Sequence, residues 1–296
     1  RNDCERRRVY PIFFRLPEWV PFLGGDPITS FGVFMFLAFL TGGVLLRREM
    51  DRVGLEADKA WDVLFMAVVG GVLGAKIYYI LLNYPQLMEN PRALIFSRGG
   101  MVWYGGFLGA VGLILWELRR SKLPLPLMAD ITAAPLAIAY AVGRIGCFLV
   151  GDDYGRPTAS WVGIKFPQGT PATRVDALES HFGIQVDPTI VEQFGQVVPV
   201  HPTQLYEIGM SLGIFFLLWH FRSHRHRVGF IWMLWMILAG AERFLVEIVR
   251  VKDDRFFGPM TLAQVLSLAL IIAGIYGVSR TWTVGGDEGA AEMAPG

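Results

Sequence analysis

Long apolar stretches, each close to the length that crosses a lipid bilayer, most constrain the fold of this chain. A spanning helix needs about 20 predominantly apolar residues, and inside lipid the backbone must satisfy its own hydrogen bonds. The sequence therefore predicts an all-α polytopic membrane protein with about seven transmembrane helices. The expected spans are 27–46, 61–83, 99–116, 124–151, 203–221, 228–249 and 259–279.

The composition agrees with a membrane setting. Of the 296 residues, 53% are hydrophobic and 18% are charged, whereas a soluble domain carries about 25% charged residues. The net charge of +1 gives no reason to expect nucleic-acid binding. Cys4 and Cys147 lie far apart in the sequence, so no disulfide framework is expected.

One connection between spans is long enough to fold by itself. Residues 152–202 are polar with glycine, proline and β-forming residues, which predicts a small head between spans four and five. Basic residues follow spans one, three and five, and such residues favour the cytoplasm. The N-terminus and the head are therefore expected outside, although three arginines at 6–8 argue against this orientation. The expected segments are an extracytoplasmic or interfacial segment at 1–26, spans one to four at 27–151, an extracytoplasmic head at 152–202, spans five to seven at 203–280, and a disordered cytoplasmic tail at 281–296.

Ionisable side chains interrupt several apolar stretches, and each costs about 2.5–3.5 kcal/mol or more inside a spanning helix. Arg243, Glu247 and Arg250 are spaced i, i+4 and i+7, so they share one helix face. Arg144 lies near the end of the fourth span and Lys76 lies inside the second. These groups either support only packing and insertion or form a functional site. Arginines on several spans favour a site for an anionic lipid headgroup, because guanidinium binds phosphate in a fork.

Two shorter patterns bear on the same question. In HPTQLYE at 201–207, Gln204 and Glu207 lie on one helix face and His201 lies at the mouth of the fifth span. The run Tyr104-Gly105-Gly106 places bare backbone in the third span. Such backbone is typical of a cavity wall, although glycines also serve close helix packing.

Five ordered motifs resemble those of the prolipoprotein diacylglyceryl transferase family. GRIGCFLVGDDYG at 143–155 is similar to the family signature GR-x-G-N-F-x-x-G-E-x-x-G, and HPTQLYE at 201–207 is similar to H-P-[ST]-Q-L-Y-E. RFLVEIVR at 243–250 resembles R-F-x-x-E-x-x-R, MTLAQVLS at 260–267 resembles [ST]-x-x-Q-x-L-S, and RGGMVWYGGFLGA at 98–110 resembles GGM-x-x-H-GG. The resemblance extends from about residue 28 to residue 268.

The resemblance implies an enzyme of the bacterial inner (cytoplasmic) membrane. It would transfer the diacylglyceryl group of phosphatidylglycerol to the lipobox cysteine thiol of preprolipoproteins, as the first step of lipoprotein maturation. A thioether forms and glycerol phosphate is released. The expected partners of this monomer are phosphatidylglycerol, a preprolipoprotein lipobox peptide and membrane lipids, with no cofactor, no metal and no nucleic acid.

The resemblance also implies roles for residues at matching positions. Arg144 and Arg243 would hold the phosphate and stabilise charge on the leaving group, with Glu247 orienting Arg243. The expected catalytic residues are Arg144, Arg243, Glu247, Tyr104 and Asp152. The expected substrate-binding residues are Arg144, Lys76, Gly105, Gly106, Cys147, Gly155, His201, Gln204, Tyr206, Glu207 and Arg250.

Several positions depart from the family pattern. Tyr104 stands where the family has histidine, Cys147 where it has asparagine and Asp152 where it has glutamate. Phe31 and Lys76 replace a frequent tyrosine and an arginine. These departures keep a second hypothesis open, a divergent relative that binds phospholipid or uses a different acceptor.

The departure at Tyr104 leaves the destination of the thiol proton open. A tyrosine with an ordinary pKa near 10 is a poor base at neutral pH. Either Asp152 or Asp153 accepts the proton, or the thiol ionises beside the arginines without a strong base.

Overall fold

The computed structural model describes residues 11–15, 17, 25, 27–95, 97, 100–223, 226–251 and 255–282. The chain divides into two compact units, residues 1–42 with 133–296 and residues 43–132. We call them the first and second unit and describe each separately. Of the tail expected to be disordered at 281–296, Thr281 instead belongs to a helix, and residues 283–296 lie outside the described residues, as does most of the expected interfacial segment.

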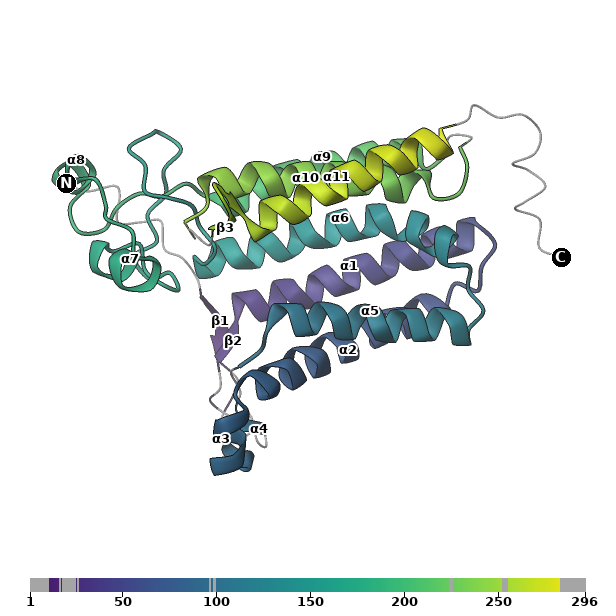
Figure 1. Ribbon diagram of the computed structural model, residues 1–296, viewed down its shortest axis with the longest axis horizontal. Helices are drawn as coiled ribbons and strands as arrows, with labels where there is room; N and C mark the ends of the chain where they lie inside the picture. The colour runs from purple at the N-terminus through teal and green to yellow at the C-terminus, as the bar shows by residue number, and fades with distance from the viewer. Residues whose placement is uncertain are drawn as a thin grey trace. The chain divides into compact units, whose positions relative to one another are not determined.

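The described chain consists mainly of helices, with two short pairs of strands (Figure 1). Strand β1 pairs antiparallel with β2, and β3 with β4. The elements in chain order are β1 (Ile12–Arg15), β2 (Pro27–Thr29), α1 (Ser30–Arg52), α2 (Lys59–Leu82), α3 (Tyr84–Glu89), α4 (Pro91–Ile95), α5 (Trp103–Arg120), α6 (Leu125–Val150), α7 (Val175–Phe182), α8 (Pro188–Phe194), α9 (Thr203–Phe221), α10 (Phe230–Val249), β3 (Arg255–Phe257), β4 (Met260–Thr261) and α11 (Leu262–Thr281).

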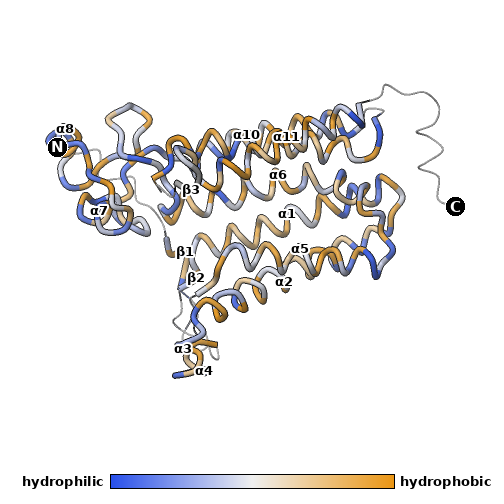
Figure 2. Tube along the Cα trace, viewed as in Figure 1, coloured by the Kyte–Doolittle hydropathy of each residue, from blue (hydrophilic) through white to orange (hydrophobic). Residues whose placement is uncertain are grey.

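Four of the described helices, α1, α2, α6 and α11, are long and apolar enough to cross a membrane. Figure 2 shows hydrophobic residues along much of their length. The expectation of a polytopic, mainly helical membrane protein is confirmed at this level. Helices α5, α9 and α10 overlap the other three expected spans. Helix α5 begins at Trp103, later than expected, because Gly100 before it has a left-handed φ of +73°.

In the second unit, α2 and α5 approach so closely that their glycines meet. A Cβ atom at Gly74 would overlap the backbone carbonyl of Gly105, and one at Gly70 would overlap that of Gly109. Small residues let helix backbones come together in membranes, where dispersion contacts replace the hydrophobic effect as the cause of association. Glycine packing therefore holds this pair of helices together.

In the first unit, α6 packs against α9 and α10 through a cluster of apolar side chains. Helix α11 packs on α10, where Gly240 and Gly274 again admit the neighbouring helix. The start of α1 lies against Gly146 of α6, where a Cβ atom would meet Phe34. The buried residues of the cluster are Ala133, Ala134, Ala137, Ile214, Leu218, Phe230 and Ile231.

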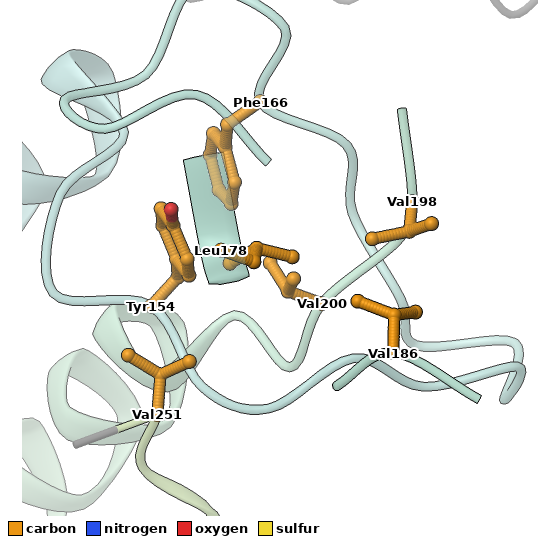
Figure 3. Packing of buried hydrophobic residues seen from close by; sticks show 7 residues of the cluster. All are labelled: Tyr154, Phe166, Leu178, Val186, Val198, Val200 and Val251. Carbon is orange, nitrogen blue, oxygen red and sulfur yellow. The ribbon is translucent and has the colours of Figure 1, made fainter. Parts of the chain in front are cut away.

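Residues 152–202, also in the first unit, fold around an apolar core of their own (Figure 3). The rings of Tyr154 and Phe166 stack with centroids 5.8 Å apart, and the Tyr154 hydroxyl donates to the Pro171 carbonyl at 2.8 Å. Val251, which follows α10, completes the core and so ties this segment to the end of that helix. The buried members are Tyr154, Phe166, Leu178, Val186, Val198, Val200 and Val251.

The contact between α2 and α5 predicts a difference between two glycines of one helix. Gly74→Ala should lower the free energy of unfolding by about 1–3 kcal/mol, because the added methyl group forces the backbones apart. Gly71→Ala is the matched control, since a Cβ atom there meets nothing within 4 Å. It should leave stability unchanged or slightly raised, because alanine is the better helix former. Thermal unfolding followed by circular dichroism would compare them, and equal losses would contradict the close approach.

Candidate functional site

Arg144, near the end of α6, contacts two carboxylates and a hydroxyl. Its Nη2 donates to Glu207 Oε1 at 2.7 Å and its Nη1 to Asp153 Oδ2 at 2.9 Å. Its Nε donates to the Tyr140 hydroxyl at 3.0 Å. The Arg144 and Glu207 side chains are only 13% and 2% exposed. Removing one partner of such a buried pair costs about 3–5 kcal/mol, so each group holds the other in place.

Asp153 continues the network to the end of α10. Its Oδ1 accepts from Arg250 Nη2, while its Oδ2 is held by Arg144. Arg250 Nη1 also lies 3.7 Å from Glu247 Oε2, and this oxygen forms an ion pair with Arg243 Nη2 at 2.6 Å. Glu247 lies between the two arginines of its helix face, as its i, i+4 and i+7 spacing predicts. It contacts both, and Arg250 is further engaged by Asp153.

Charges therefore alternate along one continuous line from α9 to α10. Each carboxylate except the first lies between two guanidinium groups, which offsets the cost of removing these charges from water. The order along the line is Glu207, Arg144, Asp153, Arg250, Glu247, Arg243.

Gly155 lies where three distant chain segments converge beside this line. Its N–H donates to the His201 carbonyl at 2.8 Å, and it forms a β-bridge with Arg250. A Cβ atom at this position would press on the Val249 carbonyl and on the side chains of His201 and Thr203. Only glycine lets these segments meet, which brings Asp153 and Arg250 into contact.

The backbone of the two aspartates is held by the start of α9. Thr203 Oγ1 donates to the Asp153 carbonyl at 2.6 Å, and the Gln204 side-chain amide donates to the Asp152 carbonyl. Asp153 has a left-handed φ of 56°, an uncommon conformation that aspartate tolerates better than most residues. This turn directs Asp153 into the arginine network.

The two adjacent aspartates differ in acidity. Burial would raise the pKa of Asp153, but the guanidinium groups of Arg250 and Arg144 outweigh burial and lower it to about 2. Burial and the nearby charge of Asp153 raise the pKa of Asp152 to about 6, and its Oδ1 is buried without a hydrogen-bond partner among the described residues. Asp153 is thus a permanent counter-ion, whereas Asp152 can exchange a proton near neutral pH.

Arg243 differs from the other arginines of the line in its unused donor capacity. Its Nη1 is buried and has no hydrogen-bond partner in the described part of the chain, and its side chain is 30% exposed. Arg144 instead places Nε on Tyr140, Nη2 on Glu207 and Nη1 on Asp153, with the buried Cys147 Sγ 3.6 Å from Nη1. Arg243 is therefore better placed to receive an anion.

The side chains of His201 and Tyr206 pair with each other. The His201 Nδ1 lies 3.1 Å from the Tyr206 hydroxyl, and burial lowers the pKa of His201. Tyr206 also borders an open apolar pocket of about 360 Å³. The pocket is lined by Trp161, Val162, Gly163, Ile164, Pro202, Leu205 and Tyr206.

Four predicted site residues belong to the second unit. Lys76 Nζ donates at 2.8 Å to both the carbonyl and the hydroxyl of Ser97. Gly105 and Gly106 approach the backbone of α2, so helix packing accounts for both glycines. Tyr104 is 47% exposed and packs edge-on against Trp103, with ring centroids 5.3 Å apart.

Sequence reasoning missed three polar residues of the first unit and gave Asp153 only a secondary place. Tyr140 lies four residues before Arg144, a helical spacing that could have shown the contact. Ser211 donates to Glu242 Oε1 at 2.7 Å, and both side chains are buried between α9 and α10. Ser211 lies four residues after Glu207, on the same face of α9.

Comparison with known proteins gives consistent matches over nearly the whole chain. The family described as prolipoprotein diacylglyceryl transferase matches residues 18–280. A phosphatidylglycerol–prolipoprotein diacylglyceryl transferase of Burkholderia thailandensis is 34% identical over 291 residues, which cover 91% of this chain and 96% of the relative. The Clostridium tetani protein of the same name is 29% identical over 255 residues, 86% of this chain and 93% of that protein. The chain belongs to the prolipoprotein diacylglyceryl transferase family.

Proposed function

We propose that the protein transfers the diacylglyceryl group of phosphatidylglycerol to a cysteine thiol of a prolipoprotein. Its relatives carry the name of this activity. The observation that carries the proposal is the charged line of three arginines and three carboxylates, at whose end Arg243 keeps a buried donor without a hydrogen-bond partner among the described residues. A guanidinium group that a carboxylate holds through one nitrogen, and that keeps donors on another, suits a phosphate.

The reaction itself defines what the site must stabilise. The thiol sulfur attacks the glyceryl carbon that bears the phosphate ester, so an S–C bond forms and a C–O bond breaks. The electron pair of the broken bond leaves with glycerol phosphate. The phosphodiester has one negative charge and the released monoester has about 1.5 to 2 at pH 7. Negative charge therefore grows on the phosphate, and one proton must leave the thiol.

Arg243 and Arg144 divide the electrostatic task. Arg243 donates to the phosphate through Nη1. Glu247 fixes the orientation of the Arg243 guanidinium, whose Nη2 lies 2.6 Å from Glu247 Oε2. Arg144 contributes a fixed positive charge close to the phosphate and has fewer free N–H groups. Fixed donors that need no rearrangement stabilise charge developing in the transition state.

Asp152 accepts the thiol proton. It occupies the position of the family glutamate, its Oδ1 lacks a hydrogen-bond partner among the described residues, and its pKa of about 6 leaves it mainly ionised at neutral pH. Asp153 is a weaker base because its pKa is about 2 and two arginines hold its carboxylate. The substrate is the lipobox peptide of a preprolipoprotein.

We propose the following membrane arrangement, which helix lengths and the charge of the loops support. Helices α5, α9 and α10 complete a seven-span protein together with the four long apolar helices. The protein lies in the inner membrane of a bacterium as a monomer. Residues 152–202 form a head outside, on the same side as the N-terminus, and the C-terminus is cytoplasmic, because basic residues gather in the opposite loops.

Transfer activity is expected to depend on the two arginines. Purified protein is incubated with phosphatidylglycerol labelled in its acyl chains and a lipobox peptide, and label on the peptide cysteine is measured. Arg144→Ala and Arg243→Ala should each lower the rate by at least about 10²-fold, since each removes charge stabilisation from the transition state. Tyr104→Phe should cost much less, because the Tyr104 hydroxyl is a poor base at neutral pH.

The controls decide between the hypotheses. Each variant is compared with wild type by its thermal unfolding, so that loss of folding is recognised. A folded wild-type protein that leaves the peptide unlabelled would rule out the transferase and favour a phospholipid-binding relative. Complete loss of activity in Tyr104→Phe would contradict the assignment of the proton to Asp152.

Activity should also rise with pH as Asp152 ionises. Its pKa is about 6, so the basic form, and with it kcat, increases through that pH and levels off above it. Asp152→Asn should remove this inflection and lower kcat by about 10²-fold.

Asp153→Asn is the matched neighbour variant for the pH profile. It should keep the inflection but move it to lower pH, because the negative charge of Asp153 contributes to the raised pKa of Asp152. Its kcat should be lower at every pH, since Arg144 and Arg250 lose their shared partner. An unchanged profile in Asp152→Asn would show that another group takes the proton.

The orientation can be tested by labelling single cysteines in intact cells. In a Cys4→Ser, Cys147→Ser background, Trp161→Cys should react with a maleimide that does not cross the inner membrane, because Trp161 is 95% exposed in the 152–202 segment. Arg119→Cys, at an exposed position at the end of α5, should react only after the cells are opened. The reverse pattern would place the 152–202 segment in the cytoplasm.

A further inference from the structure

We infer that Tyr140 is a positioning residue of the transfer reaction, which holds the Arg144 guanidinium in one orientation against Glu207. The residue lies on α6, one helical turn before Arg144. Tyr140 lies outside the five motifs that relate the chain to its family, and the next motif along the chain begins at residue 143. The kinetic consequence of this inference rests on the proposed function, whereas its geometric consequence can be measured without activity.

Tyr140 contacts Arg144 in two ways. Its hydroxyl accepts a hydrogen bond from Arg144 Nε at 3.0 Å. The guanidinium carbon of Arg144 also lies 5.1 Å from the centre of the Tyr140 ring, within the range of a cation–π contact. The ring thus restrains the position of the arginine and the hydroxyl restrains its rotation.

The same hydroxyl closes a ring of hydrogen bonds with α9. It donates to Glu207 Oε1 at 2.7 Å, and this oxygen also accepts from Arg144 Nη2 at 2.7 Å. The second oxygen of Glu207 is buried without a hydrogen-bond partner among the described residues. Tyr140, Arg144 and Glu207 therefore contact one another in all three pairings, through one shared carboxylate oxygen.

This cycle of hydrogen bonds excludes another way in which Arg144 could bind Glu207. A guanidinium group readily binds a carboxylate through two parallel N–H groups. Because Arg144 Nε donates to the Tyr140 hydroxyl, only Nη2 of Arg144 donates to Glu207. Arg144 Nη1 donates to Asp153. Without the hydroxyl, Nε and Nη2 could both bind Glu207, and the guanidinium would rotate away from the phosphate.

The expected effect is therefore on the reaction step more than on lipid binding. A misoriented guanidinium still supplies charge to the bound lipid, but it no longer matches the charge that develops on the leaving phosphate. Interactions that are stronger in the transition state than in the ground state change kcat rather than KM.

The experiment compares Tyr140→Phe with Tyr154→Phe in the full-length protein. Tyr140→Phe keeps the ring and removes the hydroxyl. Tyr154→Phe removes a hydroxyl that bonds to the Pro171 carbonyl in the core of the 152–202 segment. For each, kcat, the KM for phosphatidylglycerol and the midpoint of thermal unfolding are measured.

Tyr140→Phe should lower kcat by about 10- to 100-fold, the usual worth of a hydrogen bond to a charged group, with KM changed less than about twofold. Tyr154→Phe should lower the unfolding midpoint and leave kcat near that of wild type. A kcat of Tyr140→Phe within about twofold of wild type would overturn the inference, and so would a loss shared equally by kcat and KM.

A spectroscopic measurement keeps the inference testable if the wild-type protein transfers nothing. In protein labelled with a heavy nitrogen isotope at arginine Nε, the Arg144 N–H signal is identified by its absence from Arg144→Lys. The signal should shift and exchange faster with water in Tyr140→Phe but not in Tyr154→Phe. An unchanged signal in Tyr140→Phe would overturn the positioning role, while inactivity of the wild type alone would overturn only the transferase.

Discussion

The buried contact of Arg144 with Glu207 and Asp153 is the interaction on which the site depends. Each of these groups would be expensive to place alone in a spanning helix or beside one. Together they join the end of α6, the start of α9 and the turn that follows α6. The remaining arginines attach to this centre, because Arg250 reaches it through Asp153 and Arg243 reaches Arg250 through Glu247. The charges thus position one another as well as any ligand.

Much of the fold could be predicted from the sequence, because apolar stretches of the required length have few alternatives in lipid. The ion pair of Arg243 with Glu247 could also be predicted from the sequence, since i, i+4 spacing places both residues on one helix face. Local spacing could not show that Asp153 rather than Asp152 enters the network. That choice depends on a left-handed turn and on segments 201–203 and 249–250, which meet at Gly155 only in the folded chain.

Tyr140 was hidden for a related reason. An aromatic residue in an apolar helix is ordinarily a packing residue, and its carboxylate partner lies 67 positions away. Only the tertiary structure distinguishes a tyrosine that packs from one that donates to Glu207. The glycines of α5 present the opposite case, since their bare backbone fitted either a cavity wall or close helix packing, and the fold packs Gly105 against α2. In both cases the neighbouring helix determines the role of a residue.

The balance of charge along the line bears on how the site recognises its substrate. Three guanidinium groups face three carboxylates, so net charge alone gives little attraction for an anionic lipid. In the proposed mechanism, recognition comes instead from the direction of the donors, through Arg243 Nη1, which has no hydrogen-bond partner in the described part of the chain. A network whose positive and negative charges balance binds a phosphodiester, which has one negative charge, with only moderate affinity. As the leaving phosphate gains its second charge, the same fixed guanidinium groups interact more strongly with it, because their orientation is already set. Compensation between buried charges thus favours the transition state over the bound lipid.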